Sequence, residues 1–440
     1  MRTLKKIAQI LYCPCAKDHV IQHFAIDSRQ TKLGGLFFAL PGEKVDGHQF
    51  LGEVAQKNAI AAVVREDYSG PDFGLSLLRV DDVQSSLQTL AKIAFATRRE
   101  KVIAITGSMG KTTTKEFLAT LLEAKYRVAK TPENYNTQLT VPLTLLNLEG
   151  EYDVLILEMG MGDLGEIANL VNIAPPDIAM VTRIAPAGIE DFRGGLYAIA
   201  QAKAEIFSQT RTQLGIVSAQ AARFNTVLYG GRASKWIYGW KSDLPDVREA
   251  DFVMEEKVEG IVINDSPPIS LSFEGDHLKE NFLAAASCAR ALGLSWKEIQ
   301  DQAKKCKPYK LRFQRIERDG ITFIQDCYNA NPDSMVAALK NLPKPAKQGK
   351  VIGILGTMPD LGKASSHYHK EVGSFAAKSL DHLLCIGEEA KEMAMHFGKT
   401  AEHFSEKGAV KEKLFALAKP GDVVLIKGAN SLKLWEILKE

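Results

Sequence analysis

The chain has 440 residues, of which 45% are hydrophobic and 25% are charged, and its formal net charge is +2. A chain of this length predicts about three domains, and its near-neutral charge argues against a general role on nucleic acid or on a membrane surface. No apolar run approaches the roughly 18 residues of a membrane span. The cysteines are scattered and lack paired zinc spacing, which favours reduced thiols and a cytoplasmic location.

Residues 1–98 form the first expected domain, a small mixed α/β unit. Its start is typical of an amphipathic helix rather than a signal peptide. The apolar stretches "GGLFFAL" and "IAAVV" predict short strands, and the turn-rich "PGEKVDGHQF" separates them.

Residues 99–308 form the second expected domain, in which apolar strands alternate with helices. "KVIAITG" is a continuous apolar strand that breaks at glycine into a helix, and "DVLILEMG" and "DIAMVT" are further buried strands. This alternation predicts a parallel sheet covered by helices. The order of the polar, β-like segment 211–275 is not predictable, and one helical stretch is expected from His277 to about Lys305.

Residues 309–440 form the third expected domain, a Rossmann-like α/β unit. "ITFIQD", "VIGILG", "HLLCIG" and "DVVLIKG" are its expected strands, each followed by a plausible helix. No G-x-G-x-x-G follows any of them, so nicotinamide or flavin binding is not expected. The loop in "DCYNANPDSM" is a candidate ligand site, with Ser334 as the expected cap of the next helix.

The segment from Thr106 to Thr112 has the character of a phosphate-binding loop, but it is two residues shorter than the standard form. Gly107 and Gly110 allow a turn that points backbone N–H groups inward. Lys111 would supply a charge to the phosphates, Thr112 would offer its hydroxyl to Mg²⁺, and the helix start favours an anion. The alternative is a chance Gly-Lys-Thr at a helix start. The full set of expected nucleotide contacts in this loop is Thr106, Gly107, Ser108, Met109, Gly110, Lys111, Thr112 and Thr113.

Four further residues, when taken alone, allow either a functional role or an ordinary structural one. Glu158 ends a strand beside the loop strand, where either a Mg²⁺ ligand or a solvated acid would lie. Asn134 and Asn136 in "TPENYNTQLTVPLTLL" read as ordinary turn residues. Lys203, on a helix, reads as a solvated lysine.

Six motifs, in this order, resemble those of the Mur ligases, the ATP-dependent amide-forming enzymes of peptidoglycan synthesis. They are "ITGSMGKTTTKEFL", "TPENYNTQLTVPLTLL", "LILEMGMGDLGEI", "AKAEIF", "DCYNANPDSM" and "LGTMPDLG". The compressed loop is itself typical of this family. The resemblance implies that the chain joins D-alanyl-D-alanine to UDP-N-acetylmuramoyl-tripeptide through an acyl phosphate, with ATP and Mg²⁺, as a cytoplasmic monomer. Three alternatives stay open: addition of a single amino acid, a folylpolyglutamate-synthase-like ligase, or a catalytically weak nucleotide-binding homologue.

The resemblance also implies roles for individual residues. Lys111 and Asn134 would act in catalysis together with Lys203, which is carbamylated in the family, and Thr112 and Glu158 would hold Mg²⁺. The expected ATP contacts outside the loop are Arg312, Asn329, Asn331 and Asp360, and the expected substrate contacts are Ser28, Arg29, Asn136 and Lys427. The first domain would hold the uridine nucleotide, the second the ATP phosphates, and the third the adenosine and the dipeptide.

Several positions depart from the family pattern. Met109 stands at the usual asparagine of the loop, and Gly188 at the usual histidine that ligates a metal. Thr357 and Asp360 replace an aspartate and a glutamate, and "KGAN" keeps Lys427 but loses the usual serine and arginine. These changes leave open whether the contacts have drifted in a working enzyme or the activity is reduced.

Overall fold

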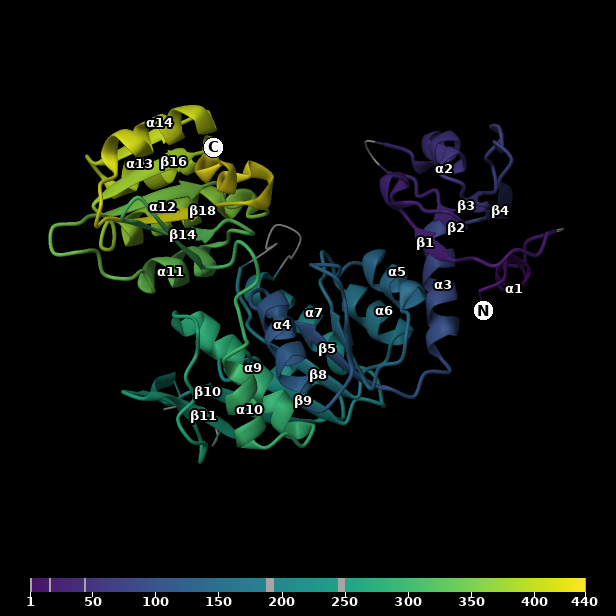
Figure 1. Cartoon of the computed structure of the whole chain (residues 1–440), viewed down its shortest axis with the longest axis horizontal. Helices are drawn as coiled ribbons and strands as arrows, with labels where there is room; N and C mark the ends of the chain where they lie inside the picture. The colour runs from purple at the N-terminus through teal and green to yellow at the C-terminus, as the bar shows by residue number, and fades with distance from the viewer. Residues whose placement is uncertain (1, 16, 43–44, 187–193, 244–249, 440) are drawn as a thin grey trace.

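The computed structural model describes residues 2–15, 17–42, 45–186, 194–243 and 250–439. Three separate sheets follow one another along the chain, and Figure 1 shows them as three bodies. We propose domain boundaries near residues 98 and 308, because each of the three sheets then falls within one block. Among the described residues, no helix combines the length and the apolar character that crossing a bilayer requires.

The N-terminal sheet has four parallel strands in sequential order. Its strands are β1 (His23–Ala25), β2 (Gly35–Phe38), β3 (Ala61–Arg65) and β4 (Ser76–Val80), and its helices are α1 (Leu4–Ile10), α2 (Leu51–Gln56) and α3 (Val83–Phe95). Strands β2 and β3 are buried on both faces, which explains why "GLFF" and "AAVV" are continuous apolar runs. Helix α3 leaves this sheet and packs against the central domain (Figure 1).

The central sheet has eight strands in the order β12-β11-β10-β9-β8-β5-β7-β6. They are β5 (Lys101–Thr106), β6 (Val128–Lys130), β7 (Val154–Glu158), β8 (Ile178–Val181), β9 (Leu214–Ser218), β10 (Ser234–Trp240), β11 (Phe252–Lys257) and β12 (Gly260–Ile263). All neighbours are parallel except the β11–β12 hairpin. Strand β5 lies between β7 and β8, so the chain reverses its direction of winding at β5. Ligands of open α/β sheets bind outside such a switch point.

Helices cover both faces of the central sheet. They are α4 (Lys111–Leu122), α5 (Thr140–Asn147), α6 (Glu166–Ile173), α7 (Gly195–Ala204), α8 (Asn225–Leu228), α9 (Asp276–Ala291) and α10 (Trp296–Ala303). Helices α4 and α9 pack against each other, where the rings of Phe117 and Phe282 meet edge to face with 6.2 Å between centroids. Because Ile103 and Ile105 of β5 face this layer while Val102 and Ala104 face the opposite one, β5 is apolar throughout.

The C-terminal sheet has the order β13-β14-β18-β15-β16-β17, with only the β13–β14 pair antiparallel. Its strands are β13 (Gln314–Arg318), β14 (Ile321–Asp326), β15 (Val351–Gly356), β16 (His382–Ile386), β17 (Ala401–Phe404) and β18 (Val423–Lys427). Its helices are α11 (Pro332–Lys340), α12 (Ser365–Ala376), α13 (Lys391–Phe397) and α14 (Lys407–Leu417). The expected α/β class is confirmed.

Two local predictions are wrong. The expected single helix from His277 is two helices, because Gly293 adopts a φ of +82° and Ser295 starts α10 with a capping box. The cap of α11 is Asn331 rather than Ser334, since Pro332 occupies the first turn and the Asn331 side chain accepts from the Ser334 N–H.

Candidate active site

The phosphate loop joins β5 to α4, and its geometry requires both glycines. Gly107 has a φ of +147° and Gly110 a φ of +83°. A Cβ atom would lie 2.0 Å from Thr182 Oγ1 at the first position and 2.2 Å from Asn281 Oδ1 at the second. Met109 contributes its backbone carbonyl, which accepts a hydrogen bond from the Thr182 hydroxyl. The main chain of the loop is therefore hydrogen-bonded to the residues that follow β8, and Met109 takes part through its backbone.

Lys111 and Thr112 begin α4 at the mouth of this loop. The Lys111 ammonium donates to the Gly107 carbonyl at 2.7 Å. Burial lowers the pKa of Lys111, and the nearby Glu158 carboxylate opposes this shift. A phosphate would compensate the same buried charge, so the loop and the lysine form a site for an anion at the start of a 12-residue helix. Thr112 is buried and Thr113 lines the adjoining cavity.

Glu158 lies at the tip of β7 and is almost fully buried. Its Oε1 accepts from the Asn136 Nδ2 at 2.7 Å, whereas its Oε2 is buried without a hydrogen-bond partner. A buried carboxylate oxygen with free lone pairs suits a hard cation, so the residues present fit Mg²⁺. Of the two asparagines, Asn136 touches this carboxylate, while Asn134 is exposed.

Lys203 lies in the last turn of α7 and is buried. Burial, and secondarily the positive charge of Lys111, holds the pKa of Lys203 well below its ordinary range. A solvated lysine would show neither property. Lys203 is therefore a buried side chain near Lys111 of the phosphate loop.

Arg312 reaches the phosphate loop from the segment that enters the C-terminal sheet. Its Nη2 donates to Thr112 Oγ1 at 3.4 Å, and its guanidinium lies 4.3 Å from the centroid of the Tyr328 ring. Its two neighbours, Leu311 and Phe313, have φ values of +59° and +50°. Bulky residues rarely adopt this conformation, and such strain is typical of functional sites.

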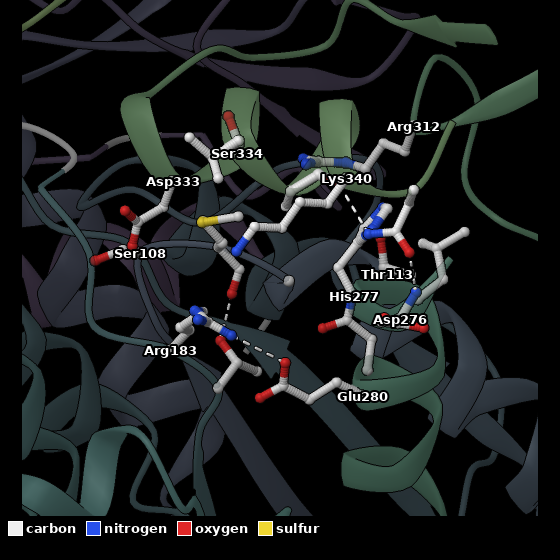
Figure 2. Close-up of a pocket in the computed structure, with 18 of the residues that line it drawn as sticks. Ser108, Thr113, Arg183, Asp276, His277, Glu280, Arg312, Asp333, Ser334 and Lys340 are labelled. Atoms are coloured by element: carbon white, nitrogen blue, oxygen red, sulfur yellow. Dashed lines mark hydrogen bonds and ion pairs between the residues drawn. The ribbon is translucent and has the colours of Figure 1, made fainter. Parts of the chain in front are cut away.

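A cavity of about 650 Å³ lies between the central and C-terminal domains. Figure 2 shows Asp333, Ser334 and Lys340 of α11 on one side of it and His277 and Glu280 of α9 on the other. The lining residues also include Ser108, Met109, Gly110, Thr113, Arg183, Asn281, Arg312, Asn329, Asn331 and Lys427. The cavity thus continues from the phosphate loop along α9, and its size suits a nucleoside.

Several of these lining residues were not predicted from the sequence. His277 and Asn281 lie four residues apart on α9, and Arg183 pairs with Glu280 at 3.1 Å. Asp333 and Lys340 lie at the two ends of α11. The spacing of His277 and Asn281 on one helix face is a signal that could have drawn attention to them.

The predicted adenosine-side residues are only partly brought together. Asn329 and Asn331 line the cavity, although the Asn331 side chain also caps α11. Lys427 is buried there, where it pairs with Asp326 at 2.6 Å and donates to the Asn329 carbonyl at 3.1 Å. Asp360 is exposed and is not among the cavity-lining residues, and Gly188 lies outside the described residues.

Ser28 and Arg29 lie in a short 3₁₀ helix of the N-terminal domain and do not line this cavity. The Ser28 hydroxyl donates to Glu53 Oε2 at 3.0 Å, and the Lys57 ammonium holds the Ser28 carbonyl at 2.8 Å. Arg29 is 84% exposed and pairs with Asp27. An exposed guanidinium on a rigid turn suits an anionic ligand, separate from the nucleotide cavity.

Fold and site together define a P-loop α/β protein with a nucleoside-sized cavity between its central and C-terminal domains and a further, N-terminal α/β domain. Family models describe the same three parts: the Mur ligase family catalytic domain matches residues 20–107, the Mur ligase middle domain residues 105–289, and the Mur ligase glutamate ligase domain residues 311–430.

Similar proteins match along the whole chain. A UDP-N-acetylmuramoyl-tripeptide–D-alanyl-D-alanine ligase of Bacillus subtilis is 30% identical over 100% of this chain and 98% of its own length. The ligase of the same name from Treponema pallidum is 33% identical over 93% of this chain and 91% of its own length. The crystal structure of MurF from Acinetobacter baumannii covers 99% of this chain and 97% of its own, with a TM-score of 0.84 at 26% identity. The structure of MurF from Thermotoga maritima in complex with ADP covers 95% of this chain and 96% of its own, with a TM-score of 0.80 at 27% identity. The chain belongs to the Mur ligase family, in its MurF branch.

Proposed function

We infer that this chain is an ATP-dependent, ADP-forming ligase that joins D-alanyl-D-alanine to UDP-N-acetylmuramoyl-tripeptide. The observation that carries this conclusion is the similarity to ligases of this name along the whole chain, including the N-terminal domain. A phosphate loop alone would support only nucleotide binding.

The chemistry starts from a carboxylate, which is a poor electrophile because it is anionic. A tripeptide carboxylate oxygen attacks the γ-phosphorus of ATP, the bond from that phosphorus to the β–γ bridging oxygen breaks, and ADP leaves. The amine of D-alanyl-D-alanine then attacks the acyl phosphate carbon, loses a proton, and expels inorganic phosphate. Lys111 and Arg312, which both contact the phosphate loop, would neutralise charge on the transferred phosphoryl group, and positioning would supply much of the remaining catalysis.

Thr112 and Glu158 are the residues that would hold Mg²⁺, and the buried Glu158 Oε2, which accepts no hydrogen bond, supports this assignment. When bound, Mg²⁺ neutralises charge on the phosphates. We propose that Lys203 carries a carbamate, because its buried, uncharged amine can add to CO₂ with release of one proton. The resulting carbamate would place a negative charge close to the ammonium of Lys111.

The other predicted residues fall into two groups. Asn329 and Asn331 would face the adenosine, Lys427 would contact the substrate, and Asp360 remains a prediction for the ribose. Ser28 and Arg29 would contact the uridine diphosphate, and Asn134 and Asn136 the substrate side of the phosphate loop. The chain is expected to act as a cytoplasmic monomer without nucleic-acid or membrane partners. Light scattering of the purified protein tests whether it is a monomer.

Phosphate release from ATP, with product analysis by mass spectrometry, tests the proposal. We expect release only when both UDP-N-acetylmuramoyl-tripeptide and D-alanyl-D-alanine are present. Release with a lone diamino acid on the shorter precursor would assign the chain to the branch that adds one amino acid. No release under any condition would favour the weak nucleotide-binding homologue.

A further inference from the structure

Lys115 is a fully buried lysine one turn along α4 from Lys111, and the proposed function gives it no role. Its ammonium donates to the Thr131 carbonyl at 2.8 Å and to the Glu133 carbonyl. Both acceptors belong to the turn between β6 and α5. One side chain of the phosphate-loop helix therefore fixes the start of the segment that carries Asn134 and Asn136.

The same ammonium faces two carboxylates. Its Nζ lies 3.4 Å from Glu116 Oε1 and 3.6 Å from Glu158 Oε2. Glu158 Oε2 is the atom that lacks a hydrogen bond, and the other Glu158 oxygen is held by Asn136. Burying a lysine is costly unless opposite charge and hydrogen bonds compensate it, so a packing role alone would suit an apolar side chain better.

The turn is attached to the tip of β7 at further points. The Glu158 N–H donates to Thr131 Oγ1 at 3.0 Å, and the Gly160 N–H donates to the Asn136 carbonyl at 2.7 Å. Glu133 has a φ of +40°, an uncommon conformation for a residue with a side chain, and its carbonyl is one of the two that Lys115 holds. Helix α4, the turn and the carboxylate thus form one connected network with Lys115 at its centre.

We propose that Lys115 is a positioning residue: it sets the orientation of the Glu158 carboxylate toward the divalent cation and, through the same ammonium, the turn that carries Asn134 and Asn136. This inference rests on the proposed function for its substrates, but not for its metal-binding part. Residues that orient a metal ligand typically change metal affinity by about 10–100-fold when they are removed.

Lys115→Met tests the proposal, with Lys130→Met as the matched control. Lys130 also pairs with Glu116, but it is 37% exposed and does not reach Glu158 or the turn. Calorimetry of ADP binding is measured with and without Mg²⁺. For Lys115→Met we expect the Mg²⁺-dependent gain in ADP affinity to fall by at least about tenfold, with metal-free ADP binding within about twofold of the unmodified protein. Lys130→Met should leave both unchanged.

A purely structural Lys115 would give a different result. Loss of ADP affinity that is equal with and without Mg²⁺, or no change in either, would overturn the proposal. In the ligase assay, Lys115→Met should also raise the KM for the uridine substrate while Lys130→Met does not. If the unmodified protein has no ligase activity, the proposed function fails, and the calorimetry still decides the metal-binding part.

Lys115→Met leaves Glu158 buried without its cation, and this variant could fail to fold. The double variant Lys115→Met/Glu158→Gln removes both charges and is compared with Glu158→Gln alone. If Lys115 acts through Glu158, the two bind ADP with Mg²⁺ within about twofold of each other, as expected for coupled residues. A further tenfold weakening in the double variant would contradict action through Glu158.

Discussion

Gly110 shows how a single residue makes the short phosphate loop possible. Its left-handed backbone brings the loop against Asn281 of α9, at a distance that leaves no room for a side chain. The sequence predicts the loop because all of its residues are contiguous. Asn281 could not be predicted in the same way, because only the packing of α9 on α4 brings it to the loop across more than 160 residues.

Gly110→Ala is expected to weaken ADP binding by about tenfold, since Asn281 must move and a left-handed alanine costs about 1–2 kcal/mol. Gly150→Ala is the matched control, because Gly150 also has a positive φ, of +73°, but a Cβ there would meet nothing within 4 Å. Isothermal titration with ADP measures both variants. Equal affinities would show that contact with Asn281 is unimportant.

The carbamylation of Lys203 should depend on CO₂ and on pH. Because burial depresses its pKa, the amine stays neutral at a lower pH than an ordinary lysine, and the carbamate is lost as pH falls and the amine becomes protonated. Carbon NMR with ¹³C-bicarbonate should show a carbamate signal that Lys203→Ala removes. The variant should also lower kcat by at least about 100-fold.

Lys235→Ala is the control, since burial also lowers the pKa of Lys235, to about 8, at a site outside the cavity lining. Loss of the carbamate signal in Lys235→Ala would show that Lys235, and not Lys203, carries the carbamate.

At the scale of elements, the strands that are buried on both faces were predictable and the edge of the central sheet was not. Strands β5, β7 and β18 are continuous apolar runs because helices cover both of their sides. Strand β11 reads "FVMEEK" and has exposed polar positions, and β12 pairs with it in an antiparallel hairpin. In this hairpin neither the apolar period of a helix nor the alternation of a strand is complete. The order of the elements in 211–275 could therefore not be predicted from the sequence.

Helix α9 should make the stability of the protein sensitive to mild acid. Burial lowers the pKa of His277 to about 4, and its Nδ1 is buried without a hydrogen-bond partner. Between the unfolded value of about 6.5 and the folded value, the unfolded chain binds a proton that the folded chain does not, so stability falls as pH falls. We expect His277→Asn to reduce the loss of unfolding free energy between pH 7 and pH 5 by about 2 kcal/mol.

Urea unfolding at the two pH values measures this difference, with His367→Gln as the control, since its side chain is 66% exposed on α12. An unchanged pH dependence in His277→Asn would mean that another group causes the acid sensitivity.

At the scale of the whole molecule, the nucleotide site depends on two domains. Arg312 belongs to the segment that leads into the C-terminal sheet, and it contacts Thr112 of the central domain. Its strained neighbours Leu311 and Phe313 fix the path of the chain at this point. A family pattern can predict the arginine, but only the three-dimensional arrangement shows which atom it meets.

Arg312→Ala should lower kcat by about 100–1000-fold, because it removes a preorganised charge from the phosphoryl group. Arg315→Ala is the matched control: Arg315 lies three residues further on, is 52% exposed and pairs with Glu317. Steady-state phosphate release under saturating substrates distinguishes them. Similar rates for the two variants would show that Arg312 does not act on the phosphoryl group.

The contact between Arg312 and Thr112 joins two domains beside the proposed site of the γ-phosphate. A nucleotide bound to the central domain alone meets the glycine loop and Lys111 but not the guanidinium. A phosphoryl group in the loop would therefore be surrounded on all sides only where the central and C-terminal domains meet. A small molecule that binds between Arg312 and Thr112 is therefore expected to inhibit the reaction without occupying the part of the cavity lined by Asn329 and Asn331.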